Sequence, residues 1–283
     1  MRRRAGALSA VGLAAASTLA FNLPATASAS MPSTPTINNW SCVPAPAHPY
    51  PVVLIHGTGD STAAWNKLSA ALTAHGYCVY GLNDGQWITT LWSINGMAPV
   101  AVSAGQVSTL IDQVRKATGA SKVDIVAHSQ GGMIGEYLAK NMHLASEIHR
   151  EVLLAPVTHG TTLNGIVHYS DYLLRLPDAA LWVACPACAD MEQGSAFVQQ
   201  LDQGPIAQPG VDYTVLETRN DTTVTPPAST FIQEPGVANH WVQDSCPSDK
   251  VGHAGMPKDP VVDQMVLNVL GTGSVGTPDC SLG

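Results

Sequence analysis

The stretch Val123-Asp-Ile-Val-Ala-His-Ser-Gln-Gly-Gly-Met-Ile134 joins an apolar run to a serine that stands between small residues. The apolar run predicts a buried strand over 122–127, and the residues that follow predict a helix over 131–141. A serine on such a tight strand-to-helix turn needs small residues two positions away on either side. Ala127 and Gly131 meet that need. We therefore expect Ser129 to be a nucleophile rather than a serine in an ordinary turn.

Strands and helices are expected to alternate on both sides of this stretch. Apolar runs predict further strands at 51–55, 77–82, 151–155, 213–217 and 240–243, and helical spacing predicts helices at 61–76, 102–116 and 259–270. This alternation predicts a mostly parallel central sheet with helices on both faces. Ligands of such sheets bind at the carboxyl ends of the strands.

The alternation stops between Ala155 and Tyr213, which is too long a gap for an ordinary connection. We expect a cap-like insertion over about residues 157–210, with an extra pair of structural helices as the alternative. The candidates for an apolar pocket wall in it are Ile166, Leu173, Leu174, Leu176 and Trp182.

The first thirty residues differ from the rest of the chain. A basic start at 1–4 precedes an apolar run at 5–21 and an Ala-rich exit at 25–30. These are the parts of a secretory signal peptide, so residues 1–29 are predicted to be removed after Ala27 or Ala29. Residues 30–283 are long enough for one well-packed domain, and the mature protein is expected to be secreted and extracellular.

Charge and cysteine content narrow the kinds of partner. The mature chain has 10 Lys and Arg against 21 Asp and Glu, a net charge of about −11, which argues against nucleic acid and anionic membranes. Six cysteines in an exported chain predict three disulfides, and counting alone leaves 15 pairings. Cys185-Pro-Ala-Cys188 fits a local disulfide better than a redox or zinc motif, and no metal or dinucleotide pattern is present.

A nucleophilic serine needs a histidine base downstream in the chain. His253 lies in a loop of small residues before the last helix, where its ring can reach the serine. His240 lies in a strand-like run and fits a packed or surface histidine better. We expect His253 to be the base.

The base in turn needs a carboxylate that orients it. Asp221 follows the strand expected at 213–217, at a strand-end turn where this topology needs an acid. The other candidates fit less well. Glu217 is inside that strand, Asp212 is before it, and Asp244 lies at the end of the next strand.

An acyl-transfer intermediate also needs N–H donors for its oxyanion. The first is the backbone N–H of Gln130, directly after the nucleophile. The second is expected from the loop that follows the first inner strand, at Thr58, through its N–H and its hydroxyl. His56 and His128 flank these positions and are expected to be structural.

These motifs resemble those of the secreted α/β-hydrolase lipases, among them actinobacterial lipases and lipase B of the yeast Candida antarctica. The resemblance covers about residues 42–280 and is carried by His56-Gly-Thr-Gly59, Ser129-Gln-Gly-Gly132, Leu154-Ala-Pro156, Gly160-Thr161, Asn220-Asp221 and His253-Ala-Gly255. It implies an α/β-hydrolase fold, an oxyanion hole at Thr58 and Gln130, and a triad of Ser129, Asp221 and His253. It also implies the disulfides Cys42–Cys78, Cys185–Cys188 and Cys246–Cys280. The chain departs from the pattern at His56-Gly57, where the family has Pro-Gly, and at Ala127, where it has Thr.

The function implied is hydrolysis of carboxylic esters, either triacylglycerols or simpler acyl esters, through an acyl-enzyme at Ser129. The alternatives are a polyester or cutin-type hydrolase, an acyltransferase, and a non-catalytic lipid-binding protein on the same scaffold. The complete Ser129, Asp221 and His253 set argues against the last of these. We expect a monomer that needs no cofactor, acts on a lipid or ester, also at a lipid–water interface, and has no integral membrane segment in its mature form.

Overall fold

The computed structural model describes residues 37–88, 93–162, 183 and 185–283. Its centre is a six-stranded sheet in the order β2-β1-β3-β4-β5-β6, and every pairing is parallel. The strands are β1 Val52–Ile55, β2 Val79–Gly81, β3 Val123–His128, β4 Ile148–Leu154, β5 Asp212–Glu217 and β6 Val237–Trp241. The predicted α/β-hydrolase architecture is thereby confirmed.

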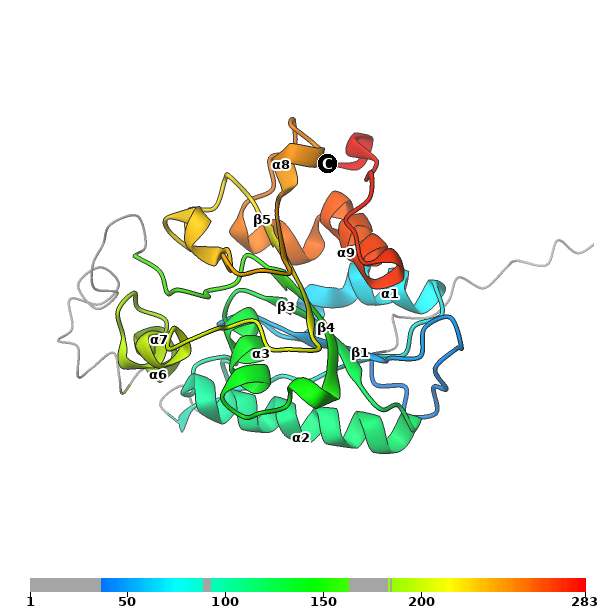
Figure 1. Cartoon of the computed structure of the whole chain (residues 1–283), viewed down its shortest axis with the longest axis horizontal. Helices are drawn as coiled ribbons and strands as arrows, with labels where there is room; N and C mark the ends of the chain where they lie inside the picture. The colour runs from blue at the N-terminus through cyan, green and yellow to red at the C-terminus, as the bar shows by residue number, and fades with distance from the viewer. Residues whose placement is uncertain (1–36, 89–92, 163–182, 184) are drawn as a thin grey trace, which may run out of the picture. The chain divides into compact units, whose positions relative to one another are not determined.

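Helices cover both faces of this sheet (Figure 1). The helices α1 (Asn66–Ala74) and α9 (Pro260–Thr272) pack on the side chains of Val52 and Leu54, whereas α2 (Val100–Thr118) and α3 (Gln130–Lys140) pack on those of Val53 and Ile55. Successive strand residues point to opposite faces, so one uninterrupted apolar run supplies both cores. All four residues of β1 are fully buried.

The helix ends follow the chemistry of the sequence. Ser61 caps the 3-10 turn Thr62–Trp65 by accepting from the N–H of Ala63, and α2 ends at Gly119, which has a φ of 71°. The shorter helical segments are Ala145–Glu147, α6 Pro186–Asp190, α7 Ala196–Leu201, Pro227–Thr230, α8 Val242–Ser245, His253–Lys258 and Cys280–Leu282. Among the described residues, no helix is both long and apolar enough to span a bilayer.

The predicted limits of three strands are wrong: the strand expected at 77–82 is β2, the one expected at 151–155 is β4, which begins at Ile148, and the third is β6. The strand expected at 240–243 is β6, which begins at Val237 and ends at Trp241, and α8 starts at the next residue. Pairing with β5 decides these limits, since Tyr213 lies opposite Val237 and Glu217 opposite Trp241. Every residue of β6 is half-buried, which leaves no alternating pattern for the sequence to reveal.

Only part of the insertion expected at 157–210 is described. Within it, α6 is joined to the start of α2, because Asp190 accepts a hydrogen bond from the N–H of Val100 at 2.9 Å. The ring of Phe197 in α7 stacks on that of Tyr137 in α3, with centroids 5.0 Å apart. The pocket-wall candidates Ile166, Leu173, Leu174, Leu176 and Trp182 lie outside the described residues, and the cap remains a prediction.

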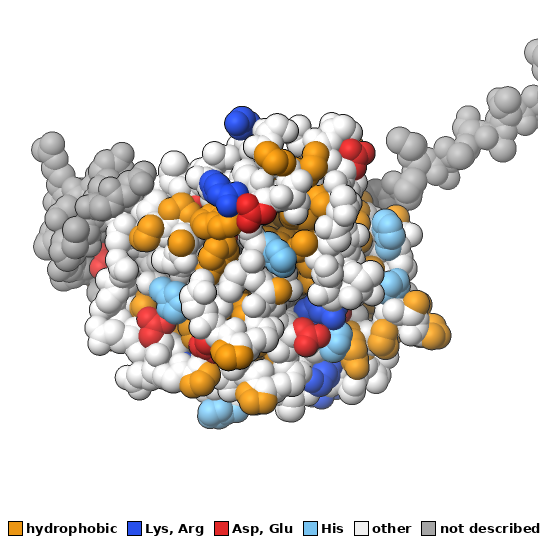
Figure 2. Space-filling view, turned by 45° about the horizontal axis from the view of Figure 1, so that its top comes forward, with side chains coloured by type: hydrophobic (Ala, Val, Ile, Leu, Met, Phe, Trp, Pro, Cys, Tyr) orange, Lys and Arg blue, Asp and Glu red, His pale blue; other side chains and the backbone are white. Residues whose placement is uncertain are grey.

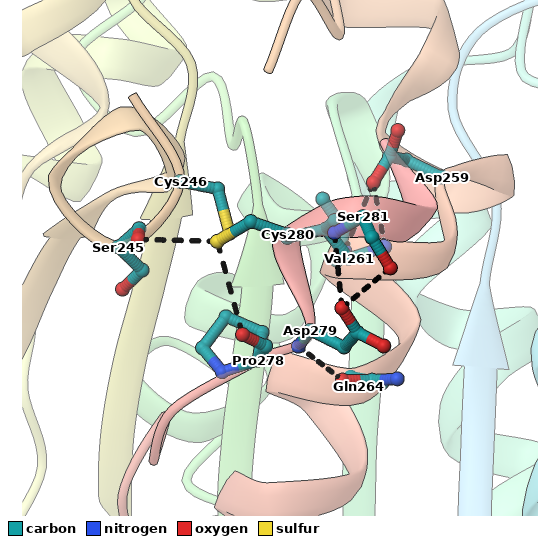
Figure 3. The surroundings of a disulfide bond; sticks show 10 residues. Ser245, Cys246, Asp259, Val261, Gln264, Pro278, Asp279, Cys280 and Ser281 are labelled. Carbon is teal, nitrogen blue, oxygen red and sulfur yellow. Dashed lines mark hydrogen bonds between the residues drawn. A yellow bond between two sulfur atoms is a disulfide. The ribbon is translucent and has the colours of Figure 1, made fainter. Parts of the chain in front are cut away.

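All six cysteines form disulfides, which join Cys42 to Cys78, Cys185 to Cys188 and Cys246 to Cys280. These are the pairs that the resemblance implies. Figure 3 shows the third, where the C-terminal tail is also held to α9, because the side chain of Gln264 accepts from the N–H of Asp279 at 2.7 Å. The tail therefore fixes the segment that starts at Cys246 and leads to His253.

Candidate active site

The turn at Ser129 has the geometry of a nucleophile elbow. Ser129 has φ 56° and ψ −123°, in a region that non-glycine residues rarely occupy, and it directly precedes α3. Neighbouring backbone segments approach this turn so closely that small residues are needed around it. A Cβ on Gly131 would clash with the carbonyl oxygen of Ile55, and one on Gly57 would lie 3.0 Å from the Cβ of Ser129.

Three side chains from separate segments meet at this turn: Ser129 directly follows β3, Asp221 lies in the turn after β5, and His253 lies in the loop after α8. Nε2 of His253 lies 2.9 Å from Oγ of Ser129, and Nδ1 of His253 lies 2.6 Å from Oδ2 of Asp221. All three residues are at most 9% exposed. Because a carboxylate only accepts, Nδ1 carries the hydrogen, and Nε2 is left to accept the serine proton when the ring is neutral. The sequence-predicted Ser129, Asp221 and His253 are thus brought into one hydrogen-bonded row.

Backbone donors hold the carboxylate of Asp221 in place. Its Oδ1 accepts from the N–H groups of Thr223 at 2.7 Å and Val224 at 2.9 Å, while Oδ2 faces His253. An aspartate that accepts from residues two and three positions ahead forms an Asx turn. Both oxygens of this buried group are therefore supplied with hydrogen-bond donors.

His128 supports the loop that carries His253. Its Nε2 donates to the main-chain oxygen of His253 at 3.0 Å, and the two rings lie 4.8 Å apart. Burial, with the nearby charge of His253 as the next cause, lowers the pKa of His128 to about 3. His128 is thus a neutral donor at working pH, in line with its predicted structural role.

Thr58 and Gln130, the predicted oxyanion donors, are in direct contact. Oγ1 of Thr58 donates to Oε1 of Gln130 at 2.9 Å, and Gln130 is the first residue of α3. The loop before Thr58 is held by His56, whose Nδ1 donates to the oxygen of Gly57 at 2.8 Å and whose Nε2 accepts from the N–H of Asp84 at 3.2 Å. The N-terminus of α3 favours negative charge at this place.

A cavity of about 290 Å³ opens beside Ser129. Its apolar lining comes from Val157, Met191, Val224 and Ala254, and polar side chains of Thr58, Asp60, Thr161 and Thr223 face it as well. Figure 2 shows hydrophobic side chains gathered on one face of the molecule, with charged groups scattered around them. The sequence alone did not predict these apolar residues as pocket lining. Val157 and Val224 follow the ends of β4 and β5, which the strand-end rule could have indicated, whereas no local signal marks Met191.

The rejected alternatives lie elsewhere. His240 lies inside β6, and Asp244 pairs with Arg219 at 2.7 Å on the surface. Asp212 is the first residue of β5, at the opposite end of that strand from Asp221, and contacts Arg150 at 3.3 Å. In the described part of the chain, no group of three or more His, Cys, Asp or Glu side chains could hold a metal ion.

Comparison with known proteins yields one family match. The model of a family described as Lipase (class 2) matches residues 49–266. Two curated relatives are named triacylglycerol lipase, from Pseudarthrobacter phenanthrenivorans and Burkholderia plantarii. Each is 34% identical over 96 residues, 32% of this chain. The match spans 28% and 25% of these relatives, so only about a quarter of their length is covered.

Two solved structures illustrate the shared fold. Aspergillus fumigatus lipase B aligns with a TM-score of 0.62 and 21% identity over 82% of this chain and 54% of its own. The mature form of a Bacillus licheniformis lipase aligns with a TM-score of 0.59 and 17% identity over 80% of this chain and 94% of its own. At these identities the likeness shows the fold alone.

Proposed function

The chain belongs to the class 2 lipase family, and on that premise we propose that it is a serine hydrolase of carboxylic esters. Ser129 is its nucleophile, His253 its base and Asp221 the acid that orients the base. The observation that carries the proposal is the row of two hydrogen bonds from Asp221 through His253 to Ser129, at 2.6 and 2.9 Å, beside a cavity.

The first step is attack of Oγ of Ser129 on the ester carbonyl carbon. Nε2 of neutral His253 takes the hydroxyl proton, and Asp221 holds the ring in the tautomer with hydrogen on Nδ1 and stabilises the imidazolium that forms. The carbonyl oxygen becomes an oxyanion, for which the N–H of Gln130 and the N–H of Thr58 are the proposed donors. His253 then protonates the departing alcohol, which leaves an acyl-enzyme.

Water completes the cycle by the same route in reverse. His253 removes a proton from water, hydroxide attacks the acyl carbonyl, and Ser129 is released with its proton restored. The ring of His253 must be neutral at the start of both halves of the cycle, since only a neutral imidazole can accept a proton.

The proposed substrate is an ester with an apolar acyl group. Val157, Met191 and Val224 supply apolar wall next to Ser129, and an apolar wall with a few fixed polar groups is typical of small-molecule sites. Rates across p-nitrophenyl esters from acetate to palmitate, together with emulsified triolein, test this. A kcat/KM that rises from acetate toward longer chains supports the apolar wall, and a flat profile contradicts it.

The decisive experiment on the mechanism is Ser129→Ala. We expect kcat for p-nitrophenyl butyrate to fall by about 10³-fold or more, with the melting temperature little changed. Ser121→Ala, at an exposed turn after α2, serves as the matched control and should keep full activity. In the wild-type protein, a fluorophosphonate probe should label Ser129 and leave Ser121 unlabelled. If Ser129→Ala kept a tenth of the wild-type kcat, the assignment would be wrong.

We further propose that the mature enzyme works outside the cell. The pairing of all six cysteines supports this, because structural disulfides persist in oxidising compartments. Expression of the full chain in a secreting host, followed by N-terminal sequencing of the protein in the medium, tests the proposal. A mature terminus after Ala27 or Ala29 is expected, and retention of the intact leader inside the cell contradicts it.

A further inference from the structure

Glu217 is a fully buried acid at the end of β5, four residues before Asp221. Its Oε1 accepts a hydrogen bond from the N–H of Thr218 at 2.6 Å. Its Oε2 has no hydrogen-bond donor among the described residues, yet the side chain lies within hydrogen-bonding reach of the Asp221 carboxyl group. The mechanism proposed above makes no use of Glu217.

Two ionised carboxylates cannot hydrogen bond to each other, since both only accept. Asp221 is already supplied with donors, because its oxygens receive Thr223 N–H, Val224 N–H and His253 Nδ1–H. Glu217 has fewer donors, the N–H of Thr218 and the hydroxyl of Thr230, so it is the member of the pair that gains more from carrying a proton. Burial, followed by the charge of Asp221, raises the pKa of Glu217 to about 9.

We propose that Glu217 is a positioning residue, a neutral carboxylic acid that donates from Oε2 to the Asp221 carboxylate and thereby fixes the acid in front of His253. This inference rests on the proposed hydrolase function. The hydrogen bond satisfies the otherwise unpartnered oxygen and gives Asp221 a side-chain support in addition to its Asx turn. Because it reaches His253 only through Asp221, Glu217 touches none of the reacting atoms.

The same strand end is tied to the histidine loop by a second contact. Thr218, the next residue, donates from Oγ1 to the oxygen of Val251 at 2.6 Å, and Val251 lies two residues before His253. Gln243 donates to the same hydroxyl at 2.9 Å. Glu217 therefore lies at a junction between the acid and the base, where a change in its side chain is transmitted to their relative placement.

The titratable groups around Glu217 determine how it responds to pH. Asp221 faces it directly, with His253 beyond, and Thr230 in the segment Pro227–Thr230 contacts it as an uncharged hydroxyl. When Glu217 ionises, the donor to Asp221 disappears and a second negative charge appears beside it. The active form is the protonated one, so activity should fall as pH rises through the pKa of Glu217.

The test compares Glu217→Gln and Glu217→Leu with the wild type, using pH-stat hydrolysis of tributyrin from about pH 6 to about pH 10. Gln keeps a donor and cannot ionise. At neutral pH its kcat should stay within about threefold of the wild type, and the alkaline fall near pH 9 should be absent. Leu removes the donor, and kcat should fall roughly 10- to 100-fold with KM little changed, because a hydrogen bond to a charged group is lost.

Glu147→Gln is the matched control, since Glu147 pairs with Arg115 at the surface and should leave the alkaline fall as it is. Melting temperatures at each pH exclude unfolding as the cause of lost activity. Wild-type and Gln profiles with the same alkaline fall would overturn the inference, as would a Leu variant with an unchanged kcat. In either case Ser129-dependent activity persists, whereas failure of the proposed function would show as wild-type hydrolysis that survives Ser129→Ala.

Discussion

Two regions of the molecule bury acidic side chains and treat them differently. At the carboxyl edge of the sheet, Asp221 is 5% exposed and its two oxygens accept from three N–H donors. Between α3 and β4, Glu136 and Glu151 are fully buried. Oε2 of Glu136 and both oxygens of Glu151 find no hydrogen-bond partner among the described residues. Equal burial therefore goes with very different hydrogen bonding.

The difference shows in the charge that each region can hold. Burial raises the pKa of Glu136 to about 8, with the hydrogen bond from Thr158 acting in the opposite direction. Burial also raises the pKa of Glu151, and the charge of Glu136 adds to the effect. Burial thus favours the neutral form of both glutamic acids, and only Glu136 has a side-chain donor, Thr158, that opposes the effect. The comparison teaches that burial alone does not decide how a carboxyl group is bonded, and that donors oppose the effect of burial on its pKa.

The sharpest way to break this comparison is Asp221→Asn. The amide keeps the size of the side chain but removes the charge and favours the wrong His253 tautomer, so kcat should fall by about 10³- to 10⁴-fold. Asp244→Asn, at an exposed acid paired with Arg219, is the control and should be silent. Steady-state kinetics of both variants provides the measurement. An active Asp221→Asn enzyme would place Asp221 in the same structural class as Glu151.

The region around Asp221 and His253 is also held by a disulfide outside the active site. Removing the Cys246–Cys280 disulfide with a double Ser variant frees a loop of 34 residues and should cost about 3–4 kcal/mol of unfolding free energy. Removing Cys185–Cys188, with a separation of 3, should cost only about 1–2 kcal/mol. Urea denaturation of both variants tests the order. If loss of Cys185–Cys188 destabilised the protein more than loss of Cys246–Cys280, the loop that carries His253 would be held without its disulfide.

The buried pair Glu136 and Glu151 should make the free energy of unfolding depend on pH. The folded pKa of Glu136 lies above its ordinary value of 4.5, so the folded state keeps a proton that the unfolded chain releases. The stabilisation is complete below about pH 4.5 and is lost as pH rises toward about 8. From pH 6 to pH 8 this group alone should cost about 2 kcal/mol.

Glu136→Gln tests that expectation, because an amide does not titrate in this range and can still accept from Thr158. Its unfolding free energy should fall less between pH 6 and pH 8 than that of the wild type. Glu151 should leave a residual slope in the variant. Glu147→Gln, at a surface ion pair, should show the wild-type slope. Equal slopes for all three proteins would mean that Glu136 is ionised when folded.

The smallest effect is expected from Thr158→Val. The hydroxyl of Thr158 lies 2.6 Å from Oε1 of Glu136 and 3.0 Å from the oxygen of Thr230, so its loss should destabilise the fold by about 1–2 kcal/mol. It should also raise the pKa of Glu136 further, which extends the pH dependence to more alkaline values. Thr109→Val, at an exposed position on α2, is the control for loss of a threonine hydroxyl that bonds only to a main-chain oxygen.

Much of the fold could be predicted because its signals are local. An apolar run, a capping serine and a terminal glycine each act over a few residues, as at β1, Ser61 and Gly119. The limits of β6 could not be predicted, because pairing with β5 sets them and its half-buried residues carry no alternation. The predicted site residues were chosen by chain order and strand ends, and the structure brings Ser129, Asp221 and His253 together.

The sequence by itself determined the elbow at Ser129, because close approaches such as that of Gly131 to Ile55 tolerate only small residues. It also determined the parallel sheet, because strand and helix alternate along the chain. Only the tertiary structure decided that Met191 lines the cavity, that Glu217 lies beside Asp221, and that Oε2 of Glu136 and both oxygens of Glu151 have no partner among the described residues. Each of these depends on distances between segments far apart in the chain, and a carboxyl group's charge depends on those distances rather than on its own neighbours in sequence.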